Sequence, residues 1–514
     1  MPLSGSVRRS AILLASAWLS LSAHPAEAQR APLAGLDAYV ERSMRDWQVP
    51  GLALAVVRHD SVIYARGYGV REFGQPGAVD AHTLFAIAST TKAFTAAALG
   101  MLVDEGKVRW DDPVSRHLPW FMVQDPYVTR ELTVRDLLTH RAGVARSDNL
   151  WLAGPFDRTE VLRRARHLAS TSGFRAGYGY HNIMFMAAGE VAGAASGMTW
   201  DDFVAQRIFR PLGMTRTTTH TAIAAADGNV AAPHVKVDGR VLASTLRDYD
   251  NIGGAGAIFS SVHDMAQWLR MQLAGGSYGG QTILQAATLK EMRTPQVVVR
   301  LDSIAERLFP DTHFQAYGLG WLLQDYHGYR MVHHSGWLNW TRTQVTMVPD
   351  RRLGVVVIAN LNDSNLQLAL SLRILDALLG LAPTDWSAEY LALARRSDER
   401  AAAQAKETEA ARVANTTPSL APAAYVGTYT NQVYGDVTVV LENERLVLRY
   451  APPDYVGDLE HWHYDTFRAV WRRAGFGRDF VTFTLDARAR VAELRLDGFG
   501  TFTRVVPEAG SPAR

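Results

Sequence analysis

The 514-residue chain contains no cysteine, which excludes disulfide bonds, thiol catalysis and cysteine-ligated zinc or iron–sulfur sites. Lysine is scarce as well, with five lysines against 48 arginines, so a lysine that falls within a motif is informative. Charge of one sign is not in excess, because 53 basic and 51 acidic residues leave a net charge of +2. This balance provides no global field that would recruit nucleic acid or an anionic membrane surface.

Long hydrophobic runs are also missing. The most apolar segment near the N-terminus, residues 11–23, is 13 residues long, whereas a helix needs about 20 residues to span a bilayer. It follows two arginines and precedes the small-residue pattern Ala26-x-Ala28, which indicates a cleavable signal peptide rather than a membrane anchor. We therefore expect residues 1–28 to be a signal peptide. The mature chain would then be periplasmic or secreted from a bacterial cell, without stable insertion in the membrane.

Length predicts two or three domains, at about 100–200 residues each. Helical and strand signals alternate over residues 29–387. The strongest are a hairpin over 51–57 and 61–69, an apolar helix over 94–103, and antiparallel strands over 342–348 and 354–360. Helices mixed with antiparallel strands predict an α+β domain in which helices cover a sheet.

The composition changes after residue 387. Residues 388–422 combine a charged, alanine-rich helical stretch with a linker that is rich in Pro, Ser and Thr. Residues 423–514 show short alternating strands at 437–441, 445–450, 480–485, 491–496 and 501–505. Turn signals separate these strands, so this segment predicts a small all-β, barrel-like domain.

The candidate for catalysis is a serine followed three residues later by a lysine. No G-x-S-x-G elbow, Walker loop or H-E-x-x-H pair is present, whereas Ser89-x-x-Lys92 lies between a strand-like segment and the apolar helix. Residues i and i+3 share one face of a helix, so the Lys92 amine can reach the Ser89 hydroxyl. A desolvated lysine can supply the base that a serine nucleophile needs. The helix N-terminus also offers a backbone N–H and a positive dipole end to an oxyanion.

Residues 85–105 (FAIASTTKAFTAAALGMLVDE) resemble the active-site segment of the serine β-lactamase and penicillin-binding-protein superfamily. The most similar branch, peptidase S12-like, holds class C β-lactamases, D-aminopeptidases and related esterases. Two further motifs follow in the family's order: Tyr180-x-Asn182 matches its Y-x-N element, and His334-x-Gly336 matches the element that is K-T-G in lactamases and often H-x-G in relatives. The resemblance implies the family's fold of helices around an antiparallel sheet.

The resemblance also implies roles for the matched residues. Ser89 would attack a carbonyl carbon and form an acyl-enzyme, with Lys92 as the proton acceptor. Tyr180 would either take a proton as phenolate or shuttle one to the leaving group. Asn182 would hydrogen-bond Lys92 and a substrate amide oxygen. A core tyrosine and a loop-capping asparagine are the structural alternatives for these two residues.

The third element, His334-Ser335-Gly336, would border the acyl-binding cleft. The backbone N–H groups of Ser89 and Trp337 are the expected oxyanion hole. A neutral histidine holds a substrate carboxylate more weakly than the lysine of the lactamases, which counts against an efficient β-lactamase. The structural alternative is that His334 is a hydrogen-bonded histidine within a sheet.

We therefore expect a serine hydrolase, without metal or other cofactor, that cleaves an ester or a small peptide, D-amino-acid-containing peptides included. The substrate is the expected partner, and a homo-oligomer is left open. One alternative is a penicillin-binding-type acyltransferase or peptide-cyclising thioesterase, against which the signal peptide argues. Another is a non-catalytic sensor of β-lactams or peptidoglycan fragments, which would be acylated without turnover.

The C-terminal segment resembles, more loosely, the lipocalin-like domain appended to some penicillin-binding-like hydrolases. The resemblance rests on AYVGTY near its start and HWHYDTF in its middle. The sequence leaves open whether this domain shapes the cleft, mediates assembly or binds an apolar group. His461 and His463 could share one face of a strand, but no third ligand is evident, so we predict no metal site.

Overall fold

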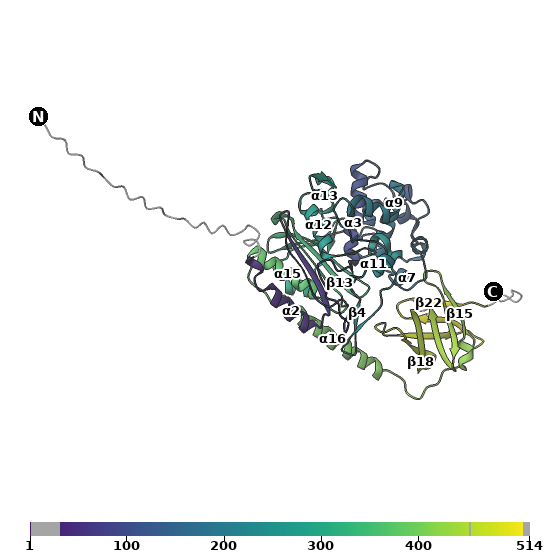
Figure 1. Cartoon of the computed structure of the whole chain (residues 1–514). Helices are drawn as coiled ribbons and strands as arrows, with labels where there is room; N and C mark the ends of the chain where they lie inside the picture. Colours follow the sequence, from purple (N-terminus) through teal and green to yellow (C-terminus); the bar gives the residue numbers. More distant parts are fainter. Residues whose placement is uncertain (2–30, 452–453, 507–514) are drawn as a thin grey trace.

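The computed structural model describes residues 1, 31–451 and 454–506, so the predicted signal peptide lies, apart from Met1, outside the described residues. A large domain and a smaller β-barrel are joined by the long helix α16, Trp386–Ala410 (Figure 1). This arrangement confirms the expected α+β fold followed by an all-β barrel.

The large domain is built on an eight-stranded antiparallel sheet in the order β2-β1-β14-β13-β12-β11-β10-β9. In chain order, the strands are β1 Gly51–Arg58, β2 Ser61–Gly69, β9 Val297–Val299, β10 Gln315–Tyr317, β11 Leu322–Tyr326, β12 Tyr329–Leu338, β13 Thr341–Val348 and β14 Leu353–Ala359. The continuous apolar sequences of β1 and β14 are buried along almost their whole length, as central strands require. The predicted hairpin β1–β2 and the predicted pair β13–β14 both form.

Helices cover both faces of the sheet (Figure 1). Alternate residues of β1 separate two cores, because Ala53 and Ala55 pack on one side and Leu52 and Leu54 on the other. The first core includes α3 Thr91–Asp104, α9 Asn182–Ser196, α12 Val262–Leu273 and α13 Ala286–Met292. The second includes α2 Leu36–Trp47, α15 Leu366–Leu379 and the start of α16. Since α3 is buried on nearly every side, it is the central helix of the domain.

Short elements complete the large domain. The short helices are α4 Val114–His117, α5 Pro126–Glu131, α6 Val134–Leu137, α7 Asn149–Leu152, α8 Arg158–Arg164, α10 Trp200–Val204, α11 Thr221–Ala226 and α14 Ser303–Leu308. Two-stranded sheets pair β3 Phe85–Ala86 with β6 Phe259–Ser260, β4 His234–Val237 with β5 Arg240–Ala243, and β7 Ser277–Tyr278 with β8 Gln281–Thr282.

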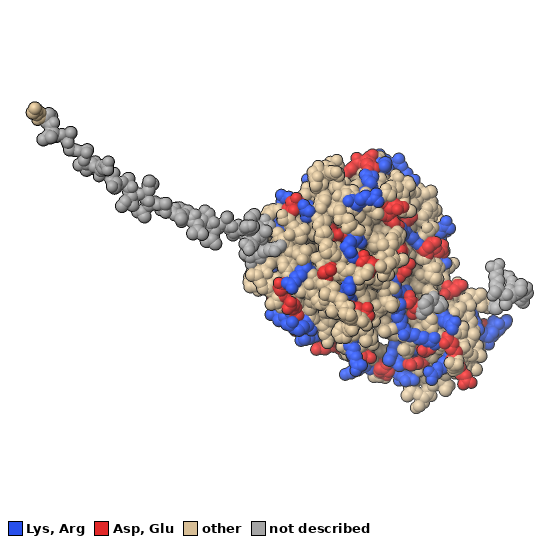
Figure 2. All heavy atoms as spheres, viewed as in Figure 1, with Lys and Arg blue, Asp and Glu red and all other residues tan. Residues whose placement is uncertain are grey.

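No helix within the described residues has the length and apolar character to cross a membrane. Figure 2 shows basic and acidic side chains interspersed over the visible face, in keeping with the small net charge.

Eight antiparallel strands close into the C-terminal barrel, each paired with the next and β22 paired back to β15. They are β15 Gly427–Asn431, β16 Gly435–Glu442, β17 Arg445–Tyr450, β18 Tyr455–His463, β19 Thr466–Trp471, β20 Arg478–Leu485, β21 Val491–Leu496 and β22 Gly500–Arg504. Closure leaves no free edge, and aromatic and branched side chains fill the interior. The sequence predicted five of these strands. It missed β15, β18 and β19, of which β18 carries charged and histidine residues between its buried ones.

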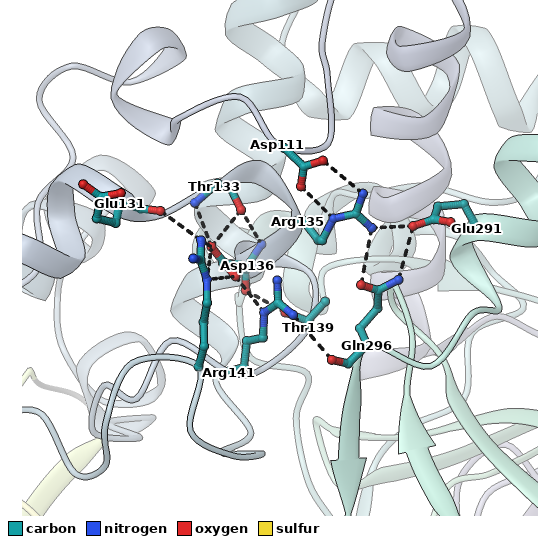
Figure 3. A network of polar contacts seen from close by, with 10 residues as sticks. Asp111, Glu131, Thr133, Arg135, Asp136, Thr139, Arg141, Glu291 and Gln296 are labelled. Carbon is teal, nitrogen blue, oxygen red and sulfur yellow. Dashed lines mark hydrogen bonds and ion pairs between the residues drawn. The ribbon is translucent and has the colours of Figure 1, made fainter.

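A buried carboxylate, Asp136, ties two segments of the large domain together (Figure 3). Thr133 and Asp136 form a capping box at the start of α6. The carboxylate also accepts from Arg141 Nε at 2.7 Å and from Arg175 Nη2 at 2.6 Å. Burial opposes ionisation, but the hydrogen bonds from Arg175 and Thr133 outweigh it and hold the pKa of Asp136 below its usual value. Arg175 belongs to the loop that leads to the predicted catalytic tyrosine.

We expect Asp136→Ala to lower the free energy of unfolding by about 2–4 kcal/mol, because two arginines and the cap lose their shared carboxylate. Chemical denaturation followed by circular dichroism measures this change. Arg130→Ala, which removes the exposed ion pair with Glu131, is the control and should change the free energy by less than about 0.5 kcal/mol. An effect of Asp136→Ala as small as that of the control would contradict the structural role of the network.

Candidate active site

Ser89 lies on a strained turn between a short strand and a buried helix. Strand β3 pairs with β6, and Ala88 then adopts a φ of 52°, a left-handed conformation that residues with a Cβ seldom take. Residues Ala88–Thr90 form a single 3₁₀ turn that continues directly into α3. The turn therefore presents the Ser89 hydroxyl at the N-terminal end of the central helix, where it is partly exposed.

The amine of Lys92 is completely buried one helical turn beyond Ser89. Nζ lies 3.0 Å from Ser89 Oγ and donates to Asn182 Oδ1 at 2.7 Å and to the carbonyl oxygen of Ala255 at 2.8 Å. Burial lowers the pKa of Lys92 well below its usual value, and the nearby Asp148 carboxylate opposes this shift only in part. A neutral amine keeps its two donor bonds and directs a lone pair at Ser89 Oγ. This is the geometry that a base requires.

Tyr180 contacts the same hydroxyl. Its Oη donates to Ser89 Oγ at 2.7 Å. Burial raises the pKa of Tyr180, so the phenol rather than the phenolate is the resting form at neutral pH. Of the two roles that the sequence allowed for Tyr180, this favours the proton shuttle.

Asn182, the first residue of α9, connects Lys92 to a carboxylate. Its Oδ1 accepts from Lys92 Nζ, and its Nδ2 donates to Asp148 Oδ1 at 2.9 Å. Trp151 Nε1 donates to the same carboxylate oxygen at 3.0 Å and holds it in place. Because both ends of the Asn182 amide are engaged, the substrate contact implied by the family resemblance would have to replace one of these bonds.

Strand β12 brings the third motif against Ser89. β11 pairs only with residues 329–333 of β12, so residues 334–338 lack a strand neighbour on that side. Gly336 is required at this point, since a Cβ there would lie 2.4 Å from a carbonyl oxygen of the nucleophile's turn and 3.2 Å from the Ser89 nitrogen. Gly336 therefore lets this stretch, which has no β11 partner, lie against the segment that carries the nucleophile, and the oxyanion hole of Ser89 and Trp337 was expected there.

His334 is buried in this strand and electrically neutral. Its Nδ1 lies 2.6 Å from the carbonyl oxygen of Ser335, which can only accept, so Nδ1 carries the proton and Nε2 accepts from Tyr317 Oη at 3.0 Å. Burial and the nearby Lys92 lower the pKa of His334 to about 3. His334 therefore offers no positive charge to a substrate carboxylate, and it is a hydrogen-bonded sheet histidine at the edge of the cleft. Ser335 and Trp337, in contrast, are exposed, Trp337 to 46%.

These residues surround one cavity of about 580 Å³. Its wall includes seven of the eight residues that the sequence singled out, and Lys92 lies directly behind Ser89. Three groups were missed: the Asp148 carboxylate, the Tyr317 hydroxyl and the Ala255 carbonyl. The first two belong to no motif, and a glycine-rich stretch is the one sequence signal for the third. The rest of the wall comes partly from other residues of the large domain and partly from the C-terminal barrel, a role of the barrel that the sequence left open.

The two barrel histidines, by contrast, do not line this cavity. His461 Nε2 donates to the carbonyl oxygen of Tyr464 at 2.9 Å, and His463 Nδ1 accepts from the Val413 N–H at 3.3 Å. Within residues 31–451 and 454–506, no group of three or more His, Asp or Glu side chains is placed to hold a metal ion.

Fold and site together define a serine hydrolase of the β-lactamase type. The family model described as "Beta-lactamase" matches residues 36–379, and the chain belongs to this family, as the motif resemblance indicated. Residues 411–507 match a second model, described as a domain of unknown function, DUF3471.

Two fungal proteins are similar to this chain over most of its length. "Unguisins hydrolase ungD'" of Aspergillus campestris is 29% identical over 439 residues, which cover 80% of this chain and 78% of the relative. "Unguisins hydrolase ungD" of Aspergillus violaceofuscus is 28% identical over 449 residues, covering 80% and 77%.

Solved structures share the fold. The octameric penicillin-binding protein homologue from Pyrococcus abyssi superposes with a TM-score of 0.62 at 20% identity, covering 92% of this chain and 100% of that one. A D-stereospecific amidohydrolase from Streptomyces gives a TM-score of 0.51 at 22% identity, covering 63% and 94%.

The buried amine predicts the acid side of the pH profile. If neutral Lys92 is the base, acylation slows as the pH falls through the lowered pKa of Lys92 and levels off above it. Asn182→Asp would place a carboxylate against Nζ and raise the pKa of Lys92, so the midpoint should move to higher pH. The pH dependence of Ser89 labelling by a fluorophosphonate measures this midpoint.

His334→Gln is the control for this experiment. Because the pKa of His334 is about 3, the residue stays neutral from about pH 5 to 9, and its replacement should leave the midpoint in place. A midpoint that moves in His334→Gln but not in Asn182→Asp would contradict the assignment of the acid limb to Lys92.

Proposed function

We propose that this protein is an exported hydrolase that cleaves an amide or ester bond through an acyl-serine intermediate. One observation carries the proposal: Ser89 Oγ lies 3.0 Å from Lys92 Nζ and 2.7 Å from Tyr180 Oη. Small peptides and esters are the proposed substrates. The names of two similar proteins, unguisins hydrolase and D-stereospecific amidohydrolase, support hydrolysis, and the second supports testing substrates with D-residues first. The N-terminal signal pattern supports export.

In the acylation step, Ser89 Oγ attacks the carbonyl carbon and its proton passes to the neutral amine of Lys92. The unpaired edge of β12 beside Ser89 supports Trp337 N–H and Ser89 N–H as donors to the oxyanion. As the bond to the leaving amine or alkoxide breaks, Tyr180 Oη protonates it. The proton held by Lys92 then restores the phenol.

In the deacylation step, a water replaces the leaving group. The pair of Lys92 and Tyr180 takes a proton from this water, whose oxygen attacks the acyl carbon, and Ser89 Oγ leaves with the proton returned to it. No glutamate contributes to the part of the cavity wall that the structure describes. Lys92 and Tyr180 would therefore serve both steps.

The test is intact-mass spectrometry after incubation with a fluorophosphonate and, separately, with a penicillin. We expect a single adduct that is absent from Ser89→Ala, together with loss of all measurable ester and amide hydrolysis in that variant. Lys92→Ala should reduce turnover by a factor of about 10³ or more, because the serine loses its base. Wild-type-like turnover in either folded variant would contradict the mechanism.

The fate of the adduct separates the proposal from its alternatives. Disappearance of the penicillin adduct with time, with free penicilloate released, supports hydrolysis. A permanent adduct without turnover of any ester or peptide would favour the sensor. Faster release by an added amine than by water would favour the acyltransferase.

A further inference from the structure

The catalytic cavity is shared between the two domains. From the large domain, the aromatic side chains of Trp337, Trp340 and Tyr249 line it; from the barrel, those of Trp471, Phe476 and Phe499 do. Phe476 contacts Trp340 across the domain boundary, with ring centroids 6.2 Å apart. The barrel therefore closes the cleft in which the Ser89 hydroxyl lies.

An arginine of the large domain holds the barrel in this position. Arg247 Nε donates to Asp454 Oδ2 at 2.8 Å, and its guanidinium lies over the rings of Tyr455 and Phe476 at 5.2 and 5.4 Å. Arg473, from the barrel, pairs with the same Asp454. The ion pair and the two ring contacts together fix the Arg247 guanidinium at the domain boundary.

The same arginine is tied to the strand beside the nucleophile. Its backbone N–H donates to Asn339 Oδ1 at 2.9 Å, and Asn339 Nδ2 donates to its carbonyl oxygen at 3.0 Å. Asn339 directly follows β12, which carries Trp337. On the other side of the cleft, Asn149 Nδ2 donates to the carbonyl oxygen of Gly498 in the barrel at 2.9 Å. The barrel is thus fixed at both sides of the cavity.

We propose that the barrel supplies a subsite for an aromatic side chain of the substrate, held between Trp337 on β12 and Phe476 and Trp471 on the barrel. This rests on the proposed function and names the substrate class. Trp337 is exposed beside the nucleophile, which is unusual for so large a ring, and the cavity exceeds what a short acyl group fills. Flat rings on both walls favour another flat ring through stacked or edge-on contact.

A carboxylate in the same wall, Asp479, contacts one of these rings. Asp479 Oδ2 accepts from Trp471 Nε1 at 2.6 Å and so fixes the plane of the indole. Trp471 is otherwise buried in the barrel core, at 6% exposure, and only its remaining exposed edge lines the cavity.

The experiment compares three esters that place the ring on either side of the scissile bond or omit it: methyl 3-phenylpropanoate, 2-phenylethyl acetate and methyl acetate. We expect kcat/KM for one aromatic ester to exceed that for methyl acetate by about tenfold or more. Phe476→Ala should reduce this ratio about tenfold, chiefly through KM, and Phe476→Leu should restore part of it. Leu441→Ala, an exposed apolar residue on the barrel, is the matched control.

Two outcomes would overturn the subsite. One is an unchanged ratio of kcat/KM between the aromatic ester and methyl acetate in Phe476→Ala, provided that the variant has the melting temperature of the wild type. The other is a preference for the cationic ester methyl 6-aminohexanoate over both aromatic esters, which would assign the wall to recognition of charge through Asp479.

A binding measurement separates this inference from the proposed function. The amides 3-phenylpropanamide and N-(2-phenylethyl)acetamide are titrated into Ser89→Ala, with and without Phe476→Ala, and tryptophan fluorescence is recorded. Weaker binding in the double variant supports the subsite even if no ester is hydrolysed, in which case the proposed function alone fails. Equal binding in both contradicts the subsite.

Discussion

The burial of a single amine is the constraint on which the site depends. An ammonium ion removed from water is strongly destabilised unless it is paired, and Lys92 has only neutral oxygens in direct contact. The nearest carboxylate, Asp148, is separated from it by the Asn182 amide. A carboxylate in direct contact would hold the amine protonated and unable to accept a proton. Asn182 therefore accepts a hydrogen bond from the Lys92 amine without forcing the amine to stay protonated.

Exclusion of water from the Lys92 amine requires close packing of the backbone segments around it. The segment that supplies the Ala255 carbonyl approaches α9 so closely that a Cβ at Gly254 would lie 2.9 Å from the carbonyl oxygen of Phe185. On the other side, Gly336 lets β12 touch the Ser89 turn, and Ala88 accepts a strained φ within that turn. The buried helix α3 and the sheet stabilise these contacts. The packing of the large domain thereby maintains a few local conformations that are unfavourable by themselves.

The sequence predicted the local part of this site and, through the family resemblance, the distant part. Ser89 and Lys92 are three residues apart on a helix, so their contact follows from helical geometry alone. Tyr180, Asn182 and His334 are far away in the chain, and no periodicity relates them to Ser89; only motif order did. Asp148 and Tyr317 were not predictable, because a single carboxylate or phenol in a loop or strand carries no pattern. The barrel was recognisable from alternating strands, whereas β18 was missed because charged and histidine residues separate its apolar ones.

In the proposed function and subsite, chemistry and recognition fall to different domains. The groups that contact Ser89 Oγ, Lys92 and Tyr180, come from the large domain, and those that the barrel adds to the cavity are chiefly aromatic rings with aspartates behind or beside them. Aromatic walls act by shape and apolar contact, so they can change without disturbing the proton pathway at the serine. The hydrogen bonds of Arg247 to Asp454 and to Asn339 hold that wall in position beside β12. Docked in this way, the barrel contributes part of the wall of the cavity that Ser89 lines, so both domains build the cleft.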